Sequence, residues 1–551
     1  MIKLKKALID QFNRDAEEVR NSLAGARLLQ AQLDILGYNK TLNMLRFDEM
    51  ADYSIFDPTP YKKRCTKVEI GNALTYMILK DIPAQYYLNL IQKDEYALFT
   101  ESIRPPSKDD IYEFQKRLDP QAVEEFVDNI ARKLHKHGVI DLNIVFIDGH
   151  VIAYFGKASV SKIRHATRGR IMKAIEMFSA NDIKGNPIIF VLKSDGSNIK
   201  QVIPELVKRL QRIFGKQTVK IVVFDRGGFK TELFIELKDE LGVDFISLAV
   251  RNPKIIKEVA EIIKNKLELF KPLHFDSEER KLVKDVADVT LTVKGIGFRC
   301  GIIRDLKTGK INIQVTSIKK DEKNCKTEMT GIAKIYSKHW NQEDAFEQEK
   351  NGMGLDKHAR YDLIQIPNAA AENKKNKLSK QIKSKDNEMN SIRGEISTLE
   401  KILKTKQDVN ISSIKKRMGG ELKKIETEKK ALMEKIEKID DDEAFYKLNT
   451  TASTFKIANI NYLFSAHNSL FNRIKNKYSN LDFNRAKIMV YQHGGSEKLI
   501  NNRLIITLDP FRNKTIHNFV VELCDELNKE SPRSPKGHIM EFHVKDWKPH
   551  R

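Results

Sequence analysis

Three acidic residues that lie far apart in the chain are the candidates for chemistry. Asp148 ends the apolar run at 144–147, Asp225 ends the run at 219–224, and Glu343 lies in a stretch with helical spacing. Mg²⁺ prefers carboxylate oxygens, and its sites combine one or two protein ligands with phosphate oxygens of a substrate. If the fold brings the three acids together, they predict metal-dependent chemistry at a phosphodiester.

Wide separation makes this triple a weak signal when it is taken alone. The chain contains 75 Asp and Glu residues, so many triples of acids could be chosen. Asp148 precedes Gly149, and because Asp-Gly is a favoured tight-turn pair, Asp148 also fits a hairpin turn. Asp225 also fits a strand-end cap, and Glu343 fits a charge on an exposed helix. The arrangement of the surrounding elements must therefore decide between these readings.

The segments around the two aspartates predict an α/β core. Runs typical of strands occupy, in chain order, 143–147, 151–155, 188–192, 219–224 and 245–248. Helical segments at 199–214 and 231–241 separate the later runs, which indicates mixed strand order with at least one parallel crossover. The first two runs are expected to form a hairpin through Asp148-Gly149-His150.

The parts of the chain before and between these segments have different residue patterns. Residues 1–140 are expected to form a helical N-terminal DNA-binding domain. In it, Ser107 is predicted to cap a helix that fits either the second helix of a helix-turn-helix or an ordinary surface helix. The catalytic core is assigned to 141–250 and 332–370. The segment 251–331 contains alternating runs and is too long for a simple loop, so it is predicted to be an inserted β-rich subdomain.

The C-terminal third begins with a periodic, charged segment. Residues 371–440 repeat apolar side chains at steps of three, four and seven, which predicts a coiled-coil hairpin of two helices. The segment 441–551 is expected to be an α/β region, with a loose tail from Ser531 onward.

Composition limits the partners and the compartment. The chain has 97 Lys and Arg against 75 Asp and Glu, a net charge of +22, and 551 residues suffice for several domains. Such a charge favours a polyanionic partner. No run of eighteen apolar residues occurs, so no membrane partner is expected and a cytoplasmic location is predicted. Four scattered cysteines favour neither a disulfide framework nor a zinc site.

A four-residue signature connects the glutamate to a known family. Tyr336, His339, Glu343 and Lys350 follow the spacing Tyr, two residues, Arg, three residues, Glu, six residues, Lys, with His339 at the Arg position. This spacing resembles the signature of bacterial insertion-sequence DDE transposases, specifically the insertion-sequence-four group. Histidine keeps a hydrogen-bond donor there but loses the permanent forked charge that suits phosphate.

The segments around the two aspartates agree with the resemblance, which covers roughly 143–361. Residues 146–150 resemble the first-acid strand of that group, and Asp225-Arg226-Gly227 resembles the segment around its second acid. A long β-rich insertion before the glutamate is also a feature of the group.

The resemblance implies a ribonuclease H-like α/β catalytic core in which Asp148, Asp225 and Glu343 hold two Mg²⁺ or Mn²⁺ ions. Tyr336 and Lys350, and more weakly His339, would contact DNA phosphates. A basic run after the first hairpin suits further phosphate contacts and consists of Lys162, Arg164, Arg168 and Arg170. Periodicity puts Tyr336, Glu343 and Lys350 on one face of a helix.

The expected activity is therefore a DNA transposase that cuts at the ends of a transposon and joins them to target DNA. Its partners would be double-stranded DNA, both element ends and target, and a second copy of the chain in a synaptic complex. Its location would be the bacterial cytoplasm, associated with the nucleoid. Two alternatives stay open: a catalytically relaxed DNA-binding coiled-coil protein derived from a transposase, and a ribonuclease H-like nuclease or resolvase.

Overall fold

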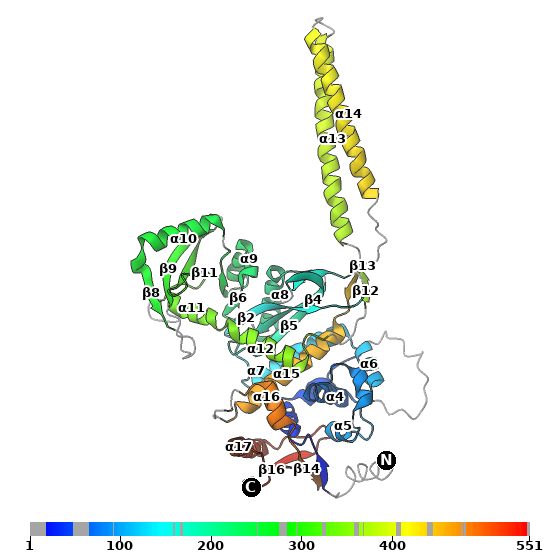
Figure 1. Ribbon diagram of the computed structural model, residues 1–551, viewed down its shortest axis with the longest axis vertical. Coiled ribbons are helices and arrows are strands. Elements are labelled where there is room, and N and C mark those ends of the chain that lie inside the picture. Colours follow the sequence, from blue (N-terminus) through cyan, green and yellow to red (C-terminus); the bar gives the residue numbers. More distant parts are fainter. Residues whose placement is uncertain are drawn as a thin grey trace. The chain divides into compact units, whose positions relative to one another are not determined.

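The computed structural model describes most of the chain (Figure 1). The described residues are 18–47, 65–91, 93–157, 160–165, 169–194, 196–250, 252–274, 284–293, 295–321, 327–357, 363–366, 369–403, 409–437, 445–474, 478 and 481–547. They form two compact units, a larger one from residues up to Tyr154 together with Lys162–Tyr361 and those from Asn449, and a smaller one from Phe155–Ser161 and Asp362–Leu448. No described helix is long and apolar enough to cross a membrane.

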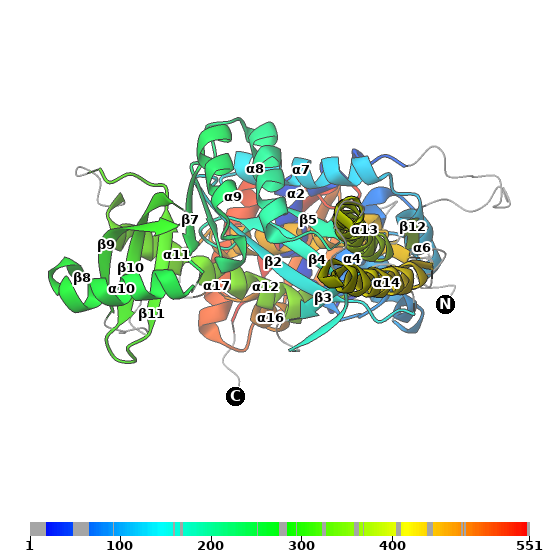
Figure 2. The same cartoon turned by 90° about the horizontal axis from the view of Figure 1, so that it is seen from above.

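A ten-stranded mixed sheet organises the larger unit, which confirms the expected α/β class (Figures 1 and 2). Its order is β3-β4-β2-β6-β7-β11-β10-β9-β8, and β5 also pairs with β4. The first strands are β2 (Ile144–Ala153), β3 (Lys162–His165), β4 (Arg170–Asn181), β5 (Pro187–Lys193), β6 (Ile221–Phe224) and β7 (Asp244–Leu248). β6 runs parallel to both β2 and β7, whereas β4 runs antiparallel to β2, β3 and β5.

The hairpin expected at Asp148-Gly149-His150 is wrong. β2 continues straight through these residues, and its antiparallel partner is β4, a strand that the sequence analysis did not predict. Gly149 lacks the positive φ that a type I′ turn requires. Its role is close packing, because a Cβ atom there would lie 2.7 Å from Glu176 Oε1 on β4. Asp148 is therefore an interior strand residue.

Helices cover both faces of the sheet around β2 and β6. Ile203 of α8 (Ile199–Phe214) approaches the turn after β6, and Ile332 of α11 (Met329–Ser337) packs with Phe146 and Val223 in one core cluster. In parallel β2 and β6, Phe146 faces the same side as Val223, so α11 lies on that side. Short α9 (Thr231–Ile235) precedes β7. α8 and α12 (His339–Met353) lie on opposite sides of β2 in Figures 1 and 2.

The strands between β7 and α11 extend the same sheet. This stretch contains α10 (Pro253–Asn265), β8 (Phe270–Leu273), β9 (Lys284–Val293), β10 (Ile296–Asp305) and β11 (Ile311–Thr316). β11 pairs antiparallel with β7, and β10 pairs with both β9 and β11. The β-rich segment expected at 251–331 is thus continuous with the sheet that carries the aspartates.

Segments from both ends of the chain share a second, four-stranded sheet. Its order is β1-β14-β15-β16, from β1 (Val19–Asn21), β14 (Gly495–Ile500), β15 (Arg503–Leu508) and β16 (Ile539–Val544). The loose tail expected from Ser531 is wrong, because β16 pairs parallel with β15 and buries Met540 and Phe542. The regions 1–140 and 441–551, which the sequence analysis separated, therefore contribute to one sheet.

Helices from both regions accompany this sheet. They are α2 (Ala26–Ile35), α3 (Tyr38–Asn43), α4 (Lys67–Leu79), α5 (Lys93–Thr100), α6 (Lys108–Lys116), α7 (Pro120–Lys136), α15 (Thr451–Phe471), α16 (Phe483–Ala486) and α17 (Lys514–Glu530). Ser107 caps α6 as predicted, and its hydroxyl accepts a hydrogen bond from the Asp110 N–H. Whether α6 belongs to a helix-turn-helix stays a prediction.

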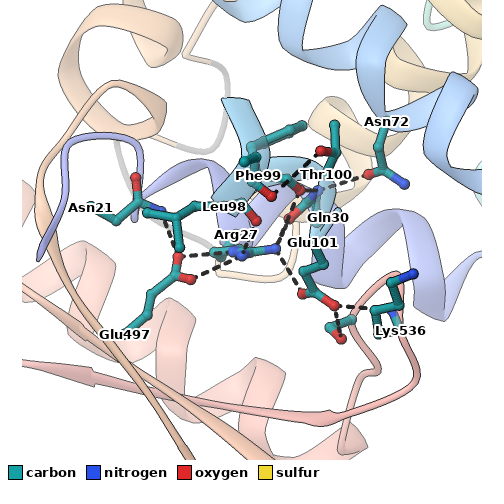
Figure 3. A network of polar contacts seen from close by, with 12 residues as sticks. Asn21, Arg27, Gln30, Asn72, Leu98, Phe99, Thr100, Glu101, Glu497 and Lys536 are labelled. Carbon is teal, nitrogen blue, oxygen red and sulfur yellow. Dashed lines mark hydrogen bonds and ion pairs between the residues drawn. The ribbon is translucent and has the colours of Figure 1, made fainter. Parts of the chain in front are cut away.

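A buried charge network joins these segments (Figure 3). The Arg27 guanidinium forms ion pairs with Glu101 at 3.0 Å and Glu497 at 2.9 Å, and it also donates to the Leu98 carbonyl. Burial alone would lower the pKa of Arg27, but the two glutamates outweigh burial and raise it. Because Lys536 N–H donates to Glu101, the network also holds the segment before β16.

The smaller unit is a helical hairpin on a short β-ladder. β12 (Leu363–Ile366) pairs antiparallel with β13 (Phe445–Leu448), and α13 (Ala369–Leu403) and α14 (Val409–Glu437) lie between them in sequence. Ion pairs link Lys385 to Glu428 and Lys415 to Glu400. As the residue number increases along α13, the residue number of its partner on α14 decreases. The two helices are therefore antiparallel, as expected from their periodicity (Figure 1).

Candidate active site

Strand register brings the two aspartates next to each other. In the parallel pair β2–β6, Ile147 lies opposite Phe224, so Asp148 and Asp225 occupy equivalent next positions on neighbouring strands. Neighbouring strands lie about 4.8 Å apart. Alternation along each strand directs both aspartates to the face covered by α11 and α12. The pairing of β2 with β6 thus brings together two aspartates whose residue numbers differ by 77.

Local backbone contacts orient each aspartate. The Gly149 N–H donates to Asp148 Oδ1 at 2.8 Å, and the Gly227 N–H donates to Asp225 Oδ1 at 2.7 Å. Gly228 is required in this turn, because a Cβ atom there would lie 2.4 Å from the Phe224 ring. Among the described residues, neither Oδ2 atom accepts a hydrogen bond. Each aspartate thus has one oxygen engaged by the backbone and one oxygen available to a ligand.

A buried glutamine fixes the helix that carries Glu343. Gln342 Nε2 donates to Asn181 Oδ1 at 3.0 Å and to the Ser179 carbonyl at 3.1 Å, which ties α12 to β4. Glu343, the next residue, has a side chain that is 44% exposed. The signature residues were expected on one continuous helix. The structure instead breaks it at Lys338 into α11 and α12, with Tyr336 before the break and His339 after it.

His339 and Tyr336 lie against the acids. His339 Nε2 is 3.7 Å from Asp148 Oδ2 and 3.7 Å from Glu343 Oε1. Its ring stacks on Tyr336 at a centroid distance of 5.9 Å. His339 Nδ1 is buried and has no hydrogen-bond partner among the described residues. The imidazole therefore sits between two carboxylates, where it can donate to one of them or to a bound anion.

Burial and the proximity of these side chains shift their pKa values. Burial, together with the negative charges of Asp225 and Glu343, raises the pKa of Asp148 to about 7. Burial also raises the pKa of Tyr336, and Asp225 and Asp148 add to that effect. Burial lowers the pKa of His339 despite the nearby carboxylates. In this arrangement Asp148 resists ionisation and His339 resists protonation. The positive charges of His150 and Arg226 act on the site, but no described Lys or Arg forms an ion pair with Asp148, Asp225 or Glu343.

Lys350 lies away from the three acids, at the end of α12. Its Nζ is 4.0 Å from Asp356 Oδ2, and Asp356 Oδ1 is 2.5 Å from His150 Nε2. Burial alone would raise the pKa of Asp356, but the hydrogen bond with His150 and the positive charges of His150, Lys350 and His165 together outweigh burial and lower the pKa. His150 is two residues after Asp148 on β2, so this second polar group begins beside the acidic pair.

The predicted basic run forms part of a β-hairpin. Lys162 and Arg164 lie on β3 and Arg170 begins β4, with His165 paired to Arg170 in the register. All three basic side chains are exposed. Arg168 lies outside the described residues. The exposed charges thus decorate a two-stranded ribbon next to β2 in the strand order.

Two residues that the sequence analysis missed belong to this region. Gln342 is the anchor described above, and its adjacency to Glu343 in the signature was the only available signal. Glu176 on β4 approaches Gly149, and burial and the charge of Asp148 raise its pKa to about 7. No sequence signal could have identified Glu176, because β4 itself was not predicted.

The donor set fits a divalent cation by its chemistry. Three carboxylates held this near one another repel unless a cation balances them, and oxygen donors suit Mg²⁺ or Mn²⁺. Within the described ranges, however, no three His, Cys, Asp or Glu side chains converge closely enough to enclose one ion. Ion binding would therefore require the exposed Glu343 side chain to turn toward the aspartates.

Comparisons with known proteins give one distant likeness. No protein-family model and no curated protein matches the chain. Among solved structures, the chain is similar to a chain of a piggyBac transposase synaptic complex with hairpin DNA, determined by cryo-EM. The identity is 12%, the TM-score is 0.32, and the likeness covers 61% of this chain and 71% of that chain. At this TM-score the likeness assigns no residue and no activity.

Proposed function

We propose that this chain is a metal-dependent DNA transposase of the insertion-sequence-four type, with a ribonuclease H-like core. One observation carries the proposal. Asp148, inside β2, and Asp225, directly after β6, occupy matching positions of the parallel pair, on the face where α12 presents Glu343. The raised pKa of Asp148 supports a shared field among the three acids. Structural ion-pair groups also shift pKa values, but in those groups a Lys or Arg pairs with the acids, and no described Lys or Arg pairs with these three.

In this proposal Asp148, Asp225 and Glu343 hold two Mg²⁺ or Mn²⁺ ions. Bound cations would activate the attacking oxygen and stabilise the leaving one during cleavage and strand transfer. The backbone N–H groups of Gly149 and Gly227 keep the two aspartates oriented. Gln342 holds α12 against the sheet so that Glu343 stays within reach.

Other side chains would bind the DNA backbone. The Tyr336 hydroxyl stays protonated, since its pKa is raised, and can donate to a phosphate oxygen. His339 would donate more weakly from between the acids. Lys350 would reach a phosphate farther along the strand, and the β3–β4 ribbon with Lys162, Arg164, Arg168 and Arg170 would add sequence-independent contacts. The partners would be element-end and target DNA and a second copy of the chain, in a bacterial cytoplasm.

The decisive experiment uses the purified full chain, Mn²⁺ and labelled DNA that carries the inverted repeats flanking its gene. We expect cleavage at the repeat end followed by joining to a target duplex, and Asp225→Asn should lose both reactions while still binding DNA. Equal cleavage by the variant would remove the proposed role of Asp225. Cleavage without joining would favour the nuclease alternative, and binding without cleavage by the unaltered chain would favour the relaxed DNA-binding protein.

A further inference from the structure

Positive charge is distributed unevenly along the helical hairpin. The segment 373–385 of α13, which lies between Glu372 and Asp386, contains six lysines and no acidic residue. The segment 421–437 of α14, which belongs to the same hairpin, contains five lysines and five glutamates. A surface selected only for solubility mixes both signs, as the second segment does. The first segment, named here the basic segment, departs from that pattern.

The ion pairs of the hairpin do not neutralise the basic segment. They join Lys385 to Glu428, Lys429 to Asp386, Arg393 to Glu426 and Lys415 to Glu400. Of the residues in these four pairs, Lys385 comes from the basic segment, and Lys375 of that segment also has an interaction partner. Lys374, Lys377, Lys380 and Lys383 are exposed, and none of these four forms an ion pair with a described residue. The interhelical ion pairs thus leave four cations directed to solvent.

This arrangement costs helix stability. Like charges three or four residues apart on a helix destabilise it by about 0.2–0.5 kcal/mol per pair, and the four exposed lysines follow one another at intervals of three. Each step of three residues turns about 60° around the helix, so the four lysines spread over about half of its circumference and neighbouring ones lie close together. A polyanion along this side of the helix would relieve the repulsion.

We propose that the basic segment of α13 is a contact surface for the phosphate backbone of duplex DNA. The choice of DNA over other polyanions rests on the proposed function. Lysines on a helix surface contact phosphates as point charges and do not read bases. The surface therefore adds affinity and salt dependence, without sequence preference, to the binding provided by the larger unit.

The test is the salt dependence of DNA binding by the full chain. Fluorescence anisotropy with a 40-base-pair duplex of arbitrary sequence, from 50 to 200 mM KCl, compares two variants with the unaltered protein. The first replaces Lys374, Lys377, Lys380 and Lys383 by Gln. The matched control replaces Lys423, Lys424, Lys430 and Lys435 by Gln, which removes the same charge from exposed sites that lie among glutamates.

Each lost phosphate contact makes the slope of log K against log salt shallower by about 0.9. Because one duplex can reach about two or three of the four lysines, we expect the first variant to lose about two to three units of slope and on the order of tenfold to a hundredfold in affinity at low salt. The control should change the slope by less than about one. Replacing the same four lysines of the basic segment by Glu should weaken binding further, and circular dichroism should show unchanged helix content.

The outcomes separate this surface from the catalytic proposal. An unchanged slope in the first variant, or an equal loss in both variants, overturns the contact surface even if Asp225→Asn abolishes cleavage. Loss of slope in the first variant together with unimpaired cleavage by Asp225→Asn would instead overturn only the proposed active site. Binding of phosphatidylserine vesicles but not of duplex DNA would reassign the surface to a membrane and overturn the contact with DNA.

Discussion

The larger unit gathers charge in two places and treats it in opposite ways. Around Arg27, one cation lies between Glu101 and Glu497, and backbone carbonyls and amides satisfy the remaining donors and acceptors. Around Asp148, three carboxylates share a field, and no described Lys or Arg forms an ion pair with any of them; a histidine whose pKa is lowered by burial lies between two of them. The first group is complete without a ligand, and the second is not.

In the proposed function, this difference separates a structural charge group from a functional one. A buried ion network that satisfies its own members holds elements together, here the segments from both ends of the chain. A set of like charges weakens the fold and persists where a ligand supplies the opposite charge. Burial alone therefore does not distinguish the two groups, whereas the balance of partners does.

The largest expected effect tests the role of the incomplete group. Replacing Glu343 by Gln removes a charge from the acidic face of α12, and replacing its neighbour Asp344 by Asn removes one from the other side of the helix. Loss of a cation ligand should cost several kcal/mol of transition-state stabilisation, or about a thousandfold in cleavage rate. Asp344→Asn should stay within about twofold. Single-turnover cleavage with Mn²⁺ measures both, and similar losses would contradict a site-specific role.

Removing the cation from the complete group should instead damage the fold. Arg27→Met leaves Glu101 and Glu497 buried without their partner, which should lower the free energy of unfolding by about 3–5 kcal/mol. Arg20→Met is the matched control, because Arg20 is 64% exposed and pairs with Asp509 at the surface, where about 0–1 kcal/mol is expected. Urea denaturation measures both. A small loss at Arg27 would show that water enters the network.

The sequence predicted the candidate site better than its surroundings. The ends of the runs at 144–147 and 219–224 identified Asp148 and Asp225, because apolar strands and the polar residues that follow them have local signatures. Tyr336, His339 and Glu343 were found by their spacing. Asp148 and Asp225 lie on neighbouring strands and His339 lies between Asp148 and Glu343, but Glu343 is 44% exposed and Lys350 lies beside Asp356, so a shared metal site of the three acids stays a prediction.

The missed features all depend on contacts between distant segments. An Asp-Gly pair predicts a turn locally, but pairing with β4 keeps Gly149 extended, and β4 was missed because Met, Ala and Glu in its sequence do not alternate as strand residues usually do. β16 was missed because each of its residues pairs with a β15 residue 36 positions earlier, and α17 lies between the two strands in the sequence. The break at Lys338 depends on docking of α11 and α12 to different strands.

The pH dependence of stability tests the same contrast between the two charge groups, and the expected effect is smaller than that of Arg27→Met. The pKa of Asp148 rises from an unfolded value near 3.9 to about 7 in the fold, so in the absence of metal its burial disfavours folding increasingly as the pH rises from about 4 to 7. Asp148→Asn removes this cost. In EDTA the variant should match the unaltered chain near pH 4. At pH 8 the variant should be more stable than the unaltered chain by about 2–4 kcal/mol; the upper value corresponds to the whole rise of the pKa, and the lower value allows for the 24% exposure of the Asp148 side chain.

Asp344→Asn serves again as the control and should show no such pH-dependent difference. Adding Mn²⁺ at pH 8 should stabilise the unaltered chain and not Asp148→Asn. A constant difference between the two proteins from pH 4 to pH 8, measured by thermal unfolding, would mean that Asp148 ionises normally in the fold.

The smallest expected effect concerns the one departure from the family signature. The His339 imidazole lies 3.7 Å from two carboxylates. His339→Arg places a permanent cation at this position, which should partly balance the negative charge of the three acids. In EDTA at pH 8 it should stabilise the fold by about 0.5–1 kcal/mol and raise DNA affinity about twofold to fivefold at low salt. His339→Gln keeps the site neutral and should do neither. If the Arg and Gln variants have the same stability and DNA affinity, charge balance does not determine the stability of this site. The contrast between the groups around Arg27 and Asp148 must then come from hydrogen bonding alone.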